Sequence, residues 1–271
     1  MKIKIIIFSA DELRHKFIRK RISSIKNVEV KLCLAEKNSS RQYFKVLQSK
    51  NYKLNEKKHF IKRRESEKKY FGKYLKNTKE LKSLKIIERG EFNFNKKLVD
   101  KIISLKPDLI ISYGCSIIKD PILSKFKKKF INIHLGLSPY YKGSATNFWP
   151  LVYNEPQFLG VSFLKIDKGI DTGPIIHQIR ADLEVNDNVH DIGNKLIIKM
   201  SYVLEKLILH HKKLKGQKQK VIKKIRIFKK KDYNNSALKK LEYNFKNGII
   251  SKYLKNKSRI DKKYPIIEQK L

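Results

Sequence analysis

The opening of the chain alternates two apolar, β-branched runs with one helical pattern. Residues 3–9 read IKIIIFS and residues 28–36 read VEVKLCLAE, which predicts two strands. Between them apolar residues recur at helical spacing, at Leu13, Phe17, Ile18, Ile22 and Ile25. A strand–helix–strand unit forms two parallel strands joined by a right-handed crossover, so the sequence predicts an α/β fold with a mostly parallel sheet.

The same alternation continues along the chain. A short strand and turn are expected within residues 83–93. Apolar runs predict further strands at residues 108–113, 130–135, 159–167 and 173–182. Helical patterns lie at residues 97–105 and 189–209. Helices and strands in this order form layers, with the sheet between the helices.

Two segments depart from this pattern. Residues from about 40 to 82 are polar, with Tyr and Phe scattered among Lys and Glu, which predicts an insertion of one or two surface helices. Residues 210–271 are rich in Lys with scattered apolar residues, which is compatible with a helix pair, a partly ordered tail or a small accessory domain. We therefore expect one α/β domain over residues 1–209, with the insertion inside it, and a basic C-terminal extension over residues 210–271. The first of these carries the candidate catalytic residues.

The charge of the chain points only weakly to a partner. The formal net charge is +39, from 64 Lys and Arg against 25 Asp and Glu. Such an excess fits a nucleic acid or another anionic partner. The basic residues are nevertheless dispersed, and Lys, Asn and Ile are abundant together, as an AT-biased coding sequence produces. Dispersed charge indicates a polyanion less than a clustered patch does, so nucleic-acid binding is kept only as an alternative.

Other features limit the class of protein. Cys33 and Cys115 stand in apolar runs without a partner at metal-ligand or thiol-motif spacing, so neither a disulfide framework nor a zinc site is expected. Residues 1–10 lack the form of a signal peptide, and no stretch approaches the roughly 18 uncharged residues of a membrane span. A cytoplasmic protein without a membrane partner is expected. The oligomeric state cannot be read from these residues.

Several polar residues have structural explanations. Asp187 precedes the last predicted helix and is expected to cap it. His177 lies in an apolar strand and is expected to pack in the core. His210 and His211 follow an amphipathic helix, where a solvated helix end explains them.

Asn132 and His134 are the strongest chemical signal in the sequence. Residues i and i+2 of a strand share one face, so the amide and the imidazole point to the same site near the carboxyl edge of the sheet. An amide can donate to a developing oxyanion, and an imidazole can manage a proton. An isolated pair of this kind can also merely satisfy backbone groups at a strand end.

The surroundings of this pair resemble the folate-dependent formyltransferase family. Residues 131–143 read INIHLGLSPYYKG, and residues 160–178 read GVSFLKIDKGIDTGPIIHQ. In that family a strand carrying Asn-x-His is followed by a loop and, after the next strand, by an Asp-x-Gly loop. Members include glycinamide ribonucleotide, methionyl-tRNA and nucleotide-sugar formyltransferases. The resemblance is close over residues 85–205 and implies a Rossmann-like formyltransferase fold, with the helical insertion and the Lys-rich extension added to it.

The resemblance implies an enzyme that transfers a formyl group from 10-formyltetrahydrofolate to an amine, without a metal. Asn132 would bind the formyl oxygen, His134 would stabilise the tetrahedral intermediate or protonate the leaving nitrogen, and Asp171 would orient His134 and help accept the amine proton. The expected folate-side residues are Ser116, Ile117, Ile118, Lys168, Gly169, Ile170 and Thr172. Ordinary structural roles remain open for each of these folate-side residues.

The acceptor amine is less constrained. The loop after the first strand, FSADELRHKF, has no Gly, whereas family members that bind a phosphoribosyl amine cradle phosphate with a Gly-rich loop there. The resemblance departs further at Leu135, Gly136 and Ser138, where the family usually has Pro, Ser and Leu. Residues that could face an acceptor are Arg14, His15, Tyr140, Tyr141, Lys142 and Gly143.

We expect an amino sugar as the acceptor, nucleotide-linked and destined for a surface polysaccharide. Methionyl-tRNA is the alternative, although residues 210–271 are few for the β-barrel domain that the tRNA enzymes append. A glycinamide ribonucleotide enzyme is a further alternative, and a basic binding module without turnover is the one non-enzymatic reading.

Overall fold

A central sheet organises the computed structural model, which describes residues 2–37, 46–222 and 225–270. Within these residues the sheet has seven strands in the order β3-β2-β1-β4-β5-β7-β8. The first five in this order are parallel, and β7 runs antiparallel to both of its neighbours. The strands are β1 Ile3–Ala10, β2 Val28–Glu36, β3 Leu84–Ile87, β4 Leu109–Tyr113, β5 Phe130–His134, β7 Gly160–Leu164 and β8 Ile175–Arg180. The mostly parallel α/β sheet predicted from the sequence is confirmed.

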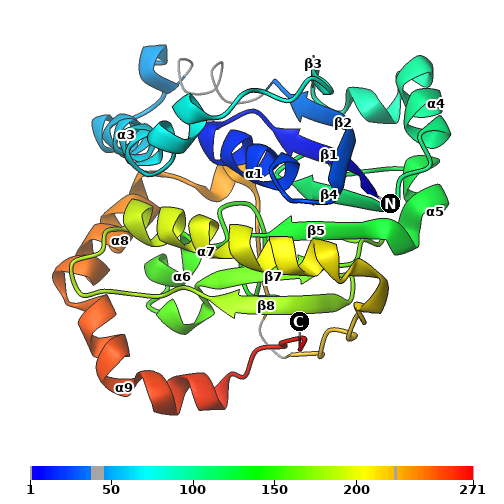
Figure 1. Ribbon diagram of the computed structural model, residues 1–271. Helices are drawn as coiled ribbons and strands as arrows, with labels where there is room; N and C mark the ends of the chain where they lie inside the picture. The colour runs from blue at the N-terminus through cyan, green and yellow to red at the C-terminus, as the bar shows by residue number, and fades with distance from the viewer. Residues whose placement is uncertain (1, 38–45, 223–224, 271) are drawn as a thin grey trace.

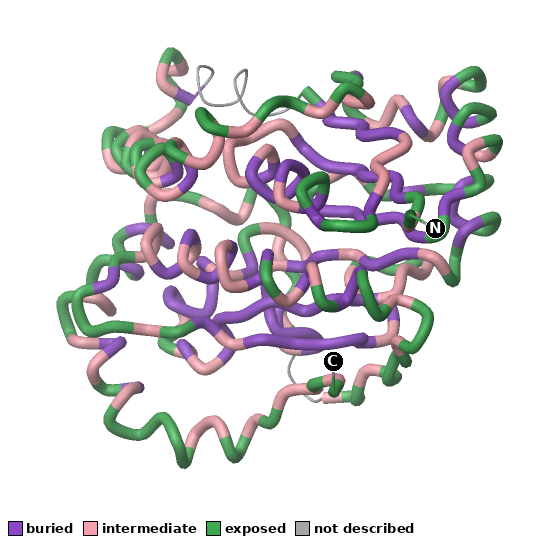
Figure 2. Tube along the Cα trace, in the orientation of Figure 1, coloured by how far each residue is buried: buried purple, intermediate pink, exposed green. Residues whose placement is uncertain are grey.

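Helices cover both faces of the sheet (Figure 1). Alternate residues of β1 point to opposite sides, so Ile5 and Ile7 pack in one core and Ile6 and Phe8 in the other. The first core lies under α1 Leu13–Ser23 and α7 Val189–Leu209. The second lies under α4 Lys96–Ser104 and α5 Ile122–Phe126. Because both faces are covered, the strands inside the sheet are buried along most of their length, whereas the edge strand β3 buries only Ile87 (Figure 2).

The predicted insertion contains a long helix, α3 Leu54–Asn77. It is not only a surface helix, because Phe71 is fully buried and stacks on Phe17 of α1 with ring centroids 4.8 Å apart. A helical period places such aromatic residues on one face, and that face packs against α1 and α7. The start of the predicted insertion, up to residue 45, lies outside the described residues.

The C-terminal segment packs onto the sheet domain. It contains η4 His211–Lys213, β9 Arg226–Phe228, η5 Lys230–Asp232, α8 Asn235–Lys246 and α9 Ile249–Lys263. Leu238 and Leu241 of α8 and Ile250 of α9 belong to the same core as α1 and α7. Near the C-terminal end, the backbone N–H of Gln178 in β8 donates to the carbonyl of Ile267 over 2.6 Å. This segment therefore shares its core with the sheet domain.

Short elements complete the fold. β6 Tyr141–Gly143 pairs in parallel with β9 in a separate two-stranded sheet. The remaining pieces are η1 Glu91–Asn93, η2 Lys127–Lys129, α6 Trp149–Val152 and η3 Pro156–Phe158. None of the helices in the described ranges combines the length and the apolar character needed to cross a membrane.

Two of the expected structural roles can be checked directly. The cap of α7 is Asn188, whose side chain accepts from the N–H groups of His190 and Asp191. The prediction that Asp187 caps this helix was therefore wrong. The Asp187 carboxylate instead accepts hydrogen bonds from the N–H of Glu184 and from Lys195. His177 does pack in the core at 7% exposure, and its Nδ1 accepts from the N–H of Gln269.

Candidate active site

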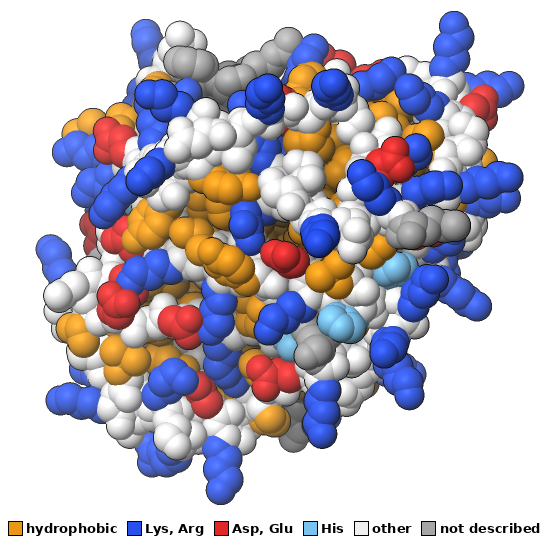
Figure 3. All heavy atoms as spheres, in the orientation of Figure 1, with side chains coloured by type: hydrophobic (Ala, Val, Ile, Leu, Met, Phe, Trp, Pro, Cys, Tyr) orange, Lys and Arg blue, Asp and Glu red, His pale blue; other side chains and the backbone are white. Residues whose placement is uncertain are grey.

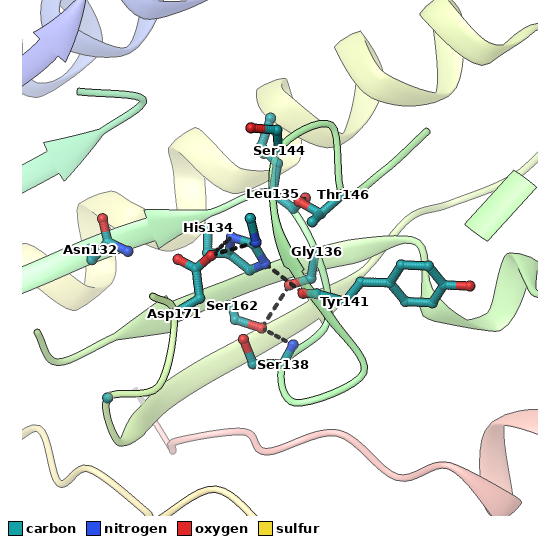
Figure 4. Close-up of polar contacts among 12 residues, drawn as sticks. Asn132, His134, Leu135, Gly136, Ser138, Tyr141, Ser144, Thr146, Ser162 and Asp171 are labelled. Carbon is teal, nitrogen blue, oxygen red and sulfur yellow. Dashed lines mark hydrogen bonds and ion pairs between the residues drawn. The ribbon is translucent and has the colours of Figure 1, made fainter. Parts of the chain in front are cut away.

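Strand β5 carries Asn132 and His134 on one face, at its carboxyl end (Figure 4). Parallel pairing sets Ser112 of β4 beside Asn132, and antiparallel pairing sets Ser162 of β7 beside His134. Residues opposite each other on adjacent strands point to the same face. Two serines thus accompany the two chemical side chains from neighbouring strands.

Ser112 fixes the orientation of the Asn132 amide. Its Oγ donates to Oδ1 of Asn132 over 2.8 Å. Among the described residues, none accepts a hydrogen bond from Nδ2 of Asn132, so the two amide hydrogens remain for a ligand. The sequence prediction missed Ser112, although a hydroxyl in the apolar run LIISY is a signal that could have found it.

His134 is held at both ring nitrogens. Nδ1 lies 3.3 Å from Oδ2 of Asp171, and Nε2 lies 2.8 Å from the carbonyl oxygen of Tyr141 (Figure 4). The histidine side chain is 5% exposed and the aspartate 14% exposed, so the pair lies mostly away from solvent. The structure therefore brings together His134 and Asp171, which the resemblance had joined.

Asp171 lies on the loop between β7 and β8, with its backbone in the left-handed region at φ 52°. Its Oδ2 also accepts from the N–H of Gly143 over 2.9 Å. No described residue hydrogen-bonds to Oδ1, which leaves that oxygen open. The loop itself is closed by Asp167, whose Oδ1 accepts from the N–H of Gly169 and from Oγ1 of Thr172.

The loop after His134 is fastened from β7 and β8. Oγ of Ser162 donates to the carbonyl of Gly136 over 2.8 Å and accepts from the N–H of Ser138 over 2.9 Å. The Gln178 amide donates to Ser138 and Ser162. A Cβ on Gly136 would lie only 2.8 Å from Nε2 of His134, so glycine leaves the space that the imidazole fills.

The predicted folate-side residues near β4 have separate environments. Ser116 donates from both N–H and Oγ to Glu36, over 2.9 and 3.0 Å. Ile118 is buried in the core under α4 and α5, whereas Ile117 is 62% exposed. On the other loop, Lys168, Gly169, Ile170 and Thr172 are exposed. Folate binding by these residues stays a prediction.

Arg14 and His15 form part of a buried ion cluster at the start of α1. Arg14 donates to Glu67 over 2.7 Å and to Glu12 over 2.6 Å. Burial tends to raise the pKa of the Glu12 carboxyl, but Arg14 and His15 outweigh burial and hold that pKa well below its usual range. Burial lowers the pKa of His15, whose ring packs against Tyr113 with centroids 4.6 Å apart.

Residues 140–143 contribute to the site mainly through β6. Tyr141 offers its carbonyl to His134 and donates its hydroxyl to Glu155, while Tyr140 stacks on Phe158 with centroids 4.2 Å apart. Lys142 is 6% exposed. Burial lowers the pKa of its amine, and the carboxylates of Asp171 and Asp167 oppose that shift. An acceptor-binding role for these residues stays a prediction.

Within the ranges that the structure describes, no three or more His, Cys, Asp or Glu side chains gather in a group that could hold a metal ion.

The fold and this site define an α/β protein with an amide and a His–Asp pair at the carboxyl end of a central strand. The family model described as formyl transferase matches residues 1–208. The chain belongs to the formyl transferase family.

Individual relatives give the range of similarity. A methionyl-tRNA formyltransferase from Buchnera aphidicola is 35% identical over 150 residues, which are 52% of this chain and 47% of that protein. A 4-N formyltransferase from Francisella tularensis superposes with a TM-score of 0.55 at 20% identity, covering 85% of this chain and 77% of that structure. A phosphoribosylglycinamide formyltransferase from Streptococcus pneumoniae gives a TM-score of 0.51 at 18% identity, covering 78% of this chain and 98% of that structure.

These similarities differ in what they establish. The matches to the curated relatives span about a third to a half of each relative's length, from 32% to 47%. The solved structures, at 20% identity or less, show the shared fold. The family and fold are thus established, and the acceptor is not.

Proposed function

We propose that this chain is an N-formyltransferase that moves a formyl group from 10-formyltetrahydrofolate to a primary amine. The observation that best supports this proposal is the position of the Asn132 amide next to the His134–Asp171 pair. No described residue accepts a hydrogen bond from its Nδ2. A donor aimed at a developing oxyanion and a paired imidazole are what acyl transfer to an amine requires.

The geometry divides the chemical work among the three residues. Asn132 donates from Nδ2 to the formyl oxygen as charge develops there. Oδ2 of Asp171 already accepts from Gly143 and faces His134, which leaves Oδ1 to accept the proton of the attacking amine. His134 lies between Asp171 and the Tyr141 carbonyl, where its ring stabilises the charge of the intermediate. As the bond between the formyl carbon and the folate nitrogen breaks, His134 gives a proton to that nitrogen, and the amine proton held by Asp171 replaces it. The formyl group arrives activated on its donor, so the protein supplies positioning and electrostatics.

The preferred acceptor is an amino sugar, probed as a sugar nucleotide. The described part of residues 210–270 forms α8, α9 and the three-residue strand β9 on the sheet domain, and these residues do not form a barrel such as the tRNA enzymes append. At the start of α1, the Glu12 carboxylate is ion-paired with Arg14 where other family members cradle phosphate. This arrangement disfavours a phosphoribosyl amine at that position.

One observation favours methionyl-tRNA as a second candidate acceptor. The curated relative from Buchnera aphidicola bears that name at 35% identity. Many Lys and Arg side chains also lie on the face shown in Figure 3, and their positive charge attracts a polyanion. They are dispersed over that face, so the amino sugar remains our preference.

An acceptor panel tests the proposal. Consumption of 10-formyltetrahydrofolate is followed by absorbance with amino-sugar nucleotides, methionyl-tRNA or glycinamide ribonucleotide as acceptor. We expect turnover with an amino-sugar nucleotide and a loss of at least about a hundredfold in kcat for Asn132→Ala. Turnover with methionyl-tRNA alone would replace the sugar. If the protein neither binds folate nor turns over any acceptor, the proposal that it is a formyltransferase is refuted.

A further inference from the structure

Strand β6 connects the catalytic pair to the C-terminal segment. On one side, the Tyr141 carbonyl lies against His134, and the Gly143 N–H donates to Asp171. On the other side, Tyr141–Gly143 pairs in parallel with Arg226–Phe228. A Cβ at Gly143 would lie 2.2 Å from the carbonyl oxygen of Phe228, so the two strands approach as closely as glycine permits.

A second contact from the C-terminal segment reaches Asp171 directly. Nε2 of Gln219 donates to the carbonyl oxygens of Asp171 and Gly173, each over 2.8 Å. The side chain therefore bridges the two residues that flank Thr172. Two positions earlier, Gln217 contributes only its backbone, which forms a pair of 2.8 Å hydrogen bonds with Ile175 of β8. That backbone bridge sets Gln219 over the loop.

The Asp171 loop needs such external support. Residues 168–170 and Thr172 are exposed, so little packing restrains them. Asp171 itself adopts φ 52°, a conformation that a non-glycine residue seldom holds without help from its surroundings. A carboxamide has two N–H donors on one nitrogen, which is the number that the two carbonyls require.

We propose that Gln219 is a positioning residue that holds the main chain of Asp171, and through it the carboxylate that faces His134. The inference rests on the proposed formyl transfer for its catalytic consequence. It assigns to the C-terminal segment a part in the active site, in addition to its packing on the core. Gln219 contacts no reacting group and acts only through Asp171.

Kinetics of matched variants test this role. Gln219→Met keeps the length of the side chain but removes both donors, and we expect kcat to fall about tenfold with KM unchanged, because the loop loses the two hydrogen bonds that restrain it. Gln219→Lys, which can donate to both carbonyls, should recover most of the loss. Gln217→Met is the control, because that exposed side chain hydrogen-bonds to no described residue, and its kcat should stay at the wild-type value.

A double-mutant cycle separates positioning from a general structural effect. In an Asp171→Ala background, Gln219→Met should cause no further loss of kcat, because the pathway through the carboxylate is already removed. An equal, additional loss in that background would overturn the proposal. So would a change in KM alone, or the same loss of kcat for Gln217→Met.

Hydrogen–deuterium exchange provides a readout that does not need activity. Backbone amides of residues 168–173 should exchange faster in Gln219→Met and at the wild-type rate in Gln217→Met. If the wild-type protein formylates no amine while exchange is still faster in Gln219→Met, the proposed function fails but the support of the Asp171 loop by Gln219 stands. Unchanged exchange in Gln219→Met would show that Gln219 does not support the Asp171 loop and would overturn the inference.

Discussion

At the scale of single residues, the site depends on which end of an amide faces the ligand. Asn132 presents either an acceptor or a donor, depending on the rotation of its side chain. Ser112 donates to Oδ1, so the donor end is left for a ligand, which we propose to be the formyl oxygen. A residue of the neighbouring strand β4 therefore determines which end of the Asn132 amide faces the ligand.

Ser112→Ala should remove that orientation. Oδ1 of Asn132 would then lose the hydrogen bond that fixes the amide. We expect kcat to fall about tenfold, which is less than the loss expected for Asn132→Ala. Steady-state kinetics measure the effect. Ser201→Ala is the control, since Ser201 is a buried serine of α7 that donates to Ile198. A wild-type kcat for Ser112→Ala would show that Asn132 needs no such support.

Gly136→Ala should displace the imidazole of His134. The added Cβ would lie 2.8 Å from both Nε2 of His134 and Cβ of Thr146. We expect activity to fall sharply and the free energy of unfolding to drop by about 1–3 kcal/mol. Gly193→Ala is the matched control: nothing lies within 4 Å of its Cβ position in α7, and it should stabilise the protein. Equal activity in the two variants would contradict the crowding argument.

At the scale of elements, α3 and α7 meet through two histidines. The rings of His59 in α3 and His190 in α7 lie 4.4 Å apart, with Phe148 and Tyr233 beside His59. Burial, followed by the like charges of His190 and Arg63, lowers the pKa of His59 to about 3. Burial and Arg63 lower the pKa of His190 to about 4. The contact between the helices thus favours neutral imidazoles.

This contact should make stability depend on pH. In the unfolded chain both histidines bind protons near their ordinary pKa of about 6.5, whereas the folded chain binds them only near pH 3 to 4. Stability from the neutral pair is therefore present above pH 6.5 and is lost as the pH falls toward 4. Thermal unfolding between pH 7 and 4 should show a smaller fall in Tm for His59→Phe than for wild type. An equal fall in Tm for the two proteins would contradict this effect.

At the scale of the whole molecule, the C-terminal segment shares the core of the sheet domain. Leu241 of α8 is 4% exposed within that core, whereas Tyr243 of the same helix is 65% exposed. Leu241→Ala should lower the free energy of unfolding by about 2–5 kcal/mol, and Tyr243→Ala should change it little. Denaturant unfolding followed by fluorescence should show one transition for both variants. Two separate transitions would instead support the predicted boundary at residue 209.

The sequence predicted what local patterns encode. The bounds of β2 and α7 agree with their apolar periodicity, and the Asn132 and His134 pair lies on one face as the strand period requires. The contacts of Gln219 with the Asp171 loop and of β6 with β9 were not predicted, because they join distant segments. Gln219 lies in the run GQKQK, whose composition is that of a solvated loop. Only the fold shows which glutamine faces the loop.

The pairing of β6 with β9 has a consequence for the timing of synthesis. Tyr141 becomes available on the ribosome long before its partner Arg226. Strands β1 to β8 can assemble from residues that are already translated, because domains form as the chain emerges from its N-terminus. Strand β6, whose backbone contacts His134 and Asp171, can pair with β9 only after residue 228 has left the exit tunnel. A nascent chain would therefore form its sheet first and complete the support of His134 and Asp171 only after residues 226–228 have emerged.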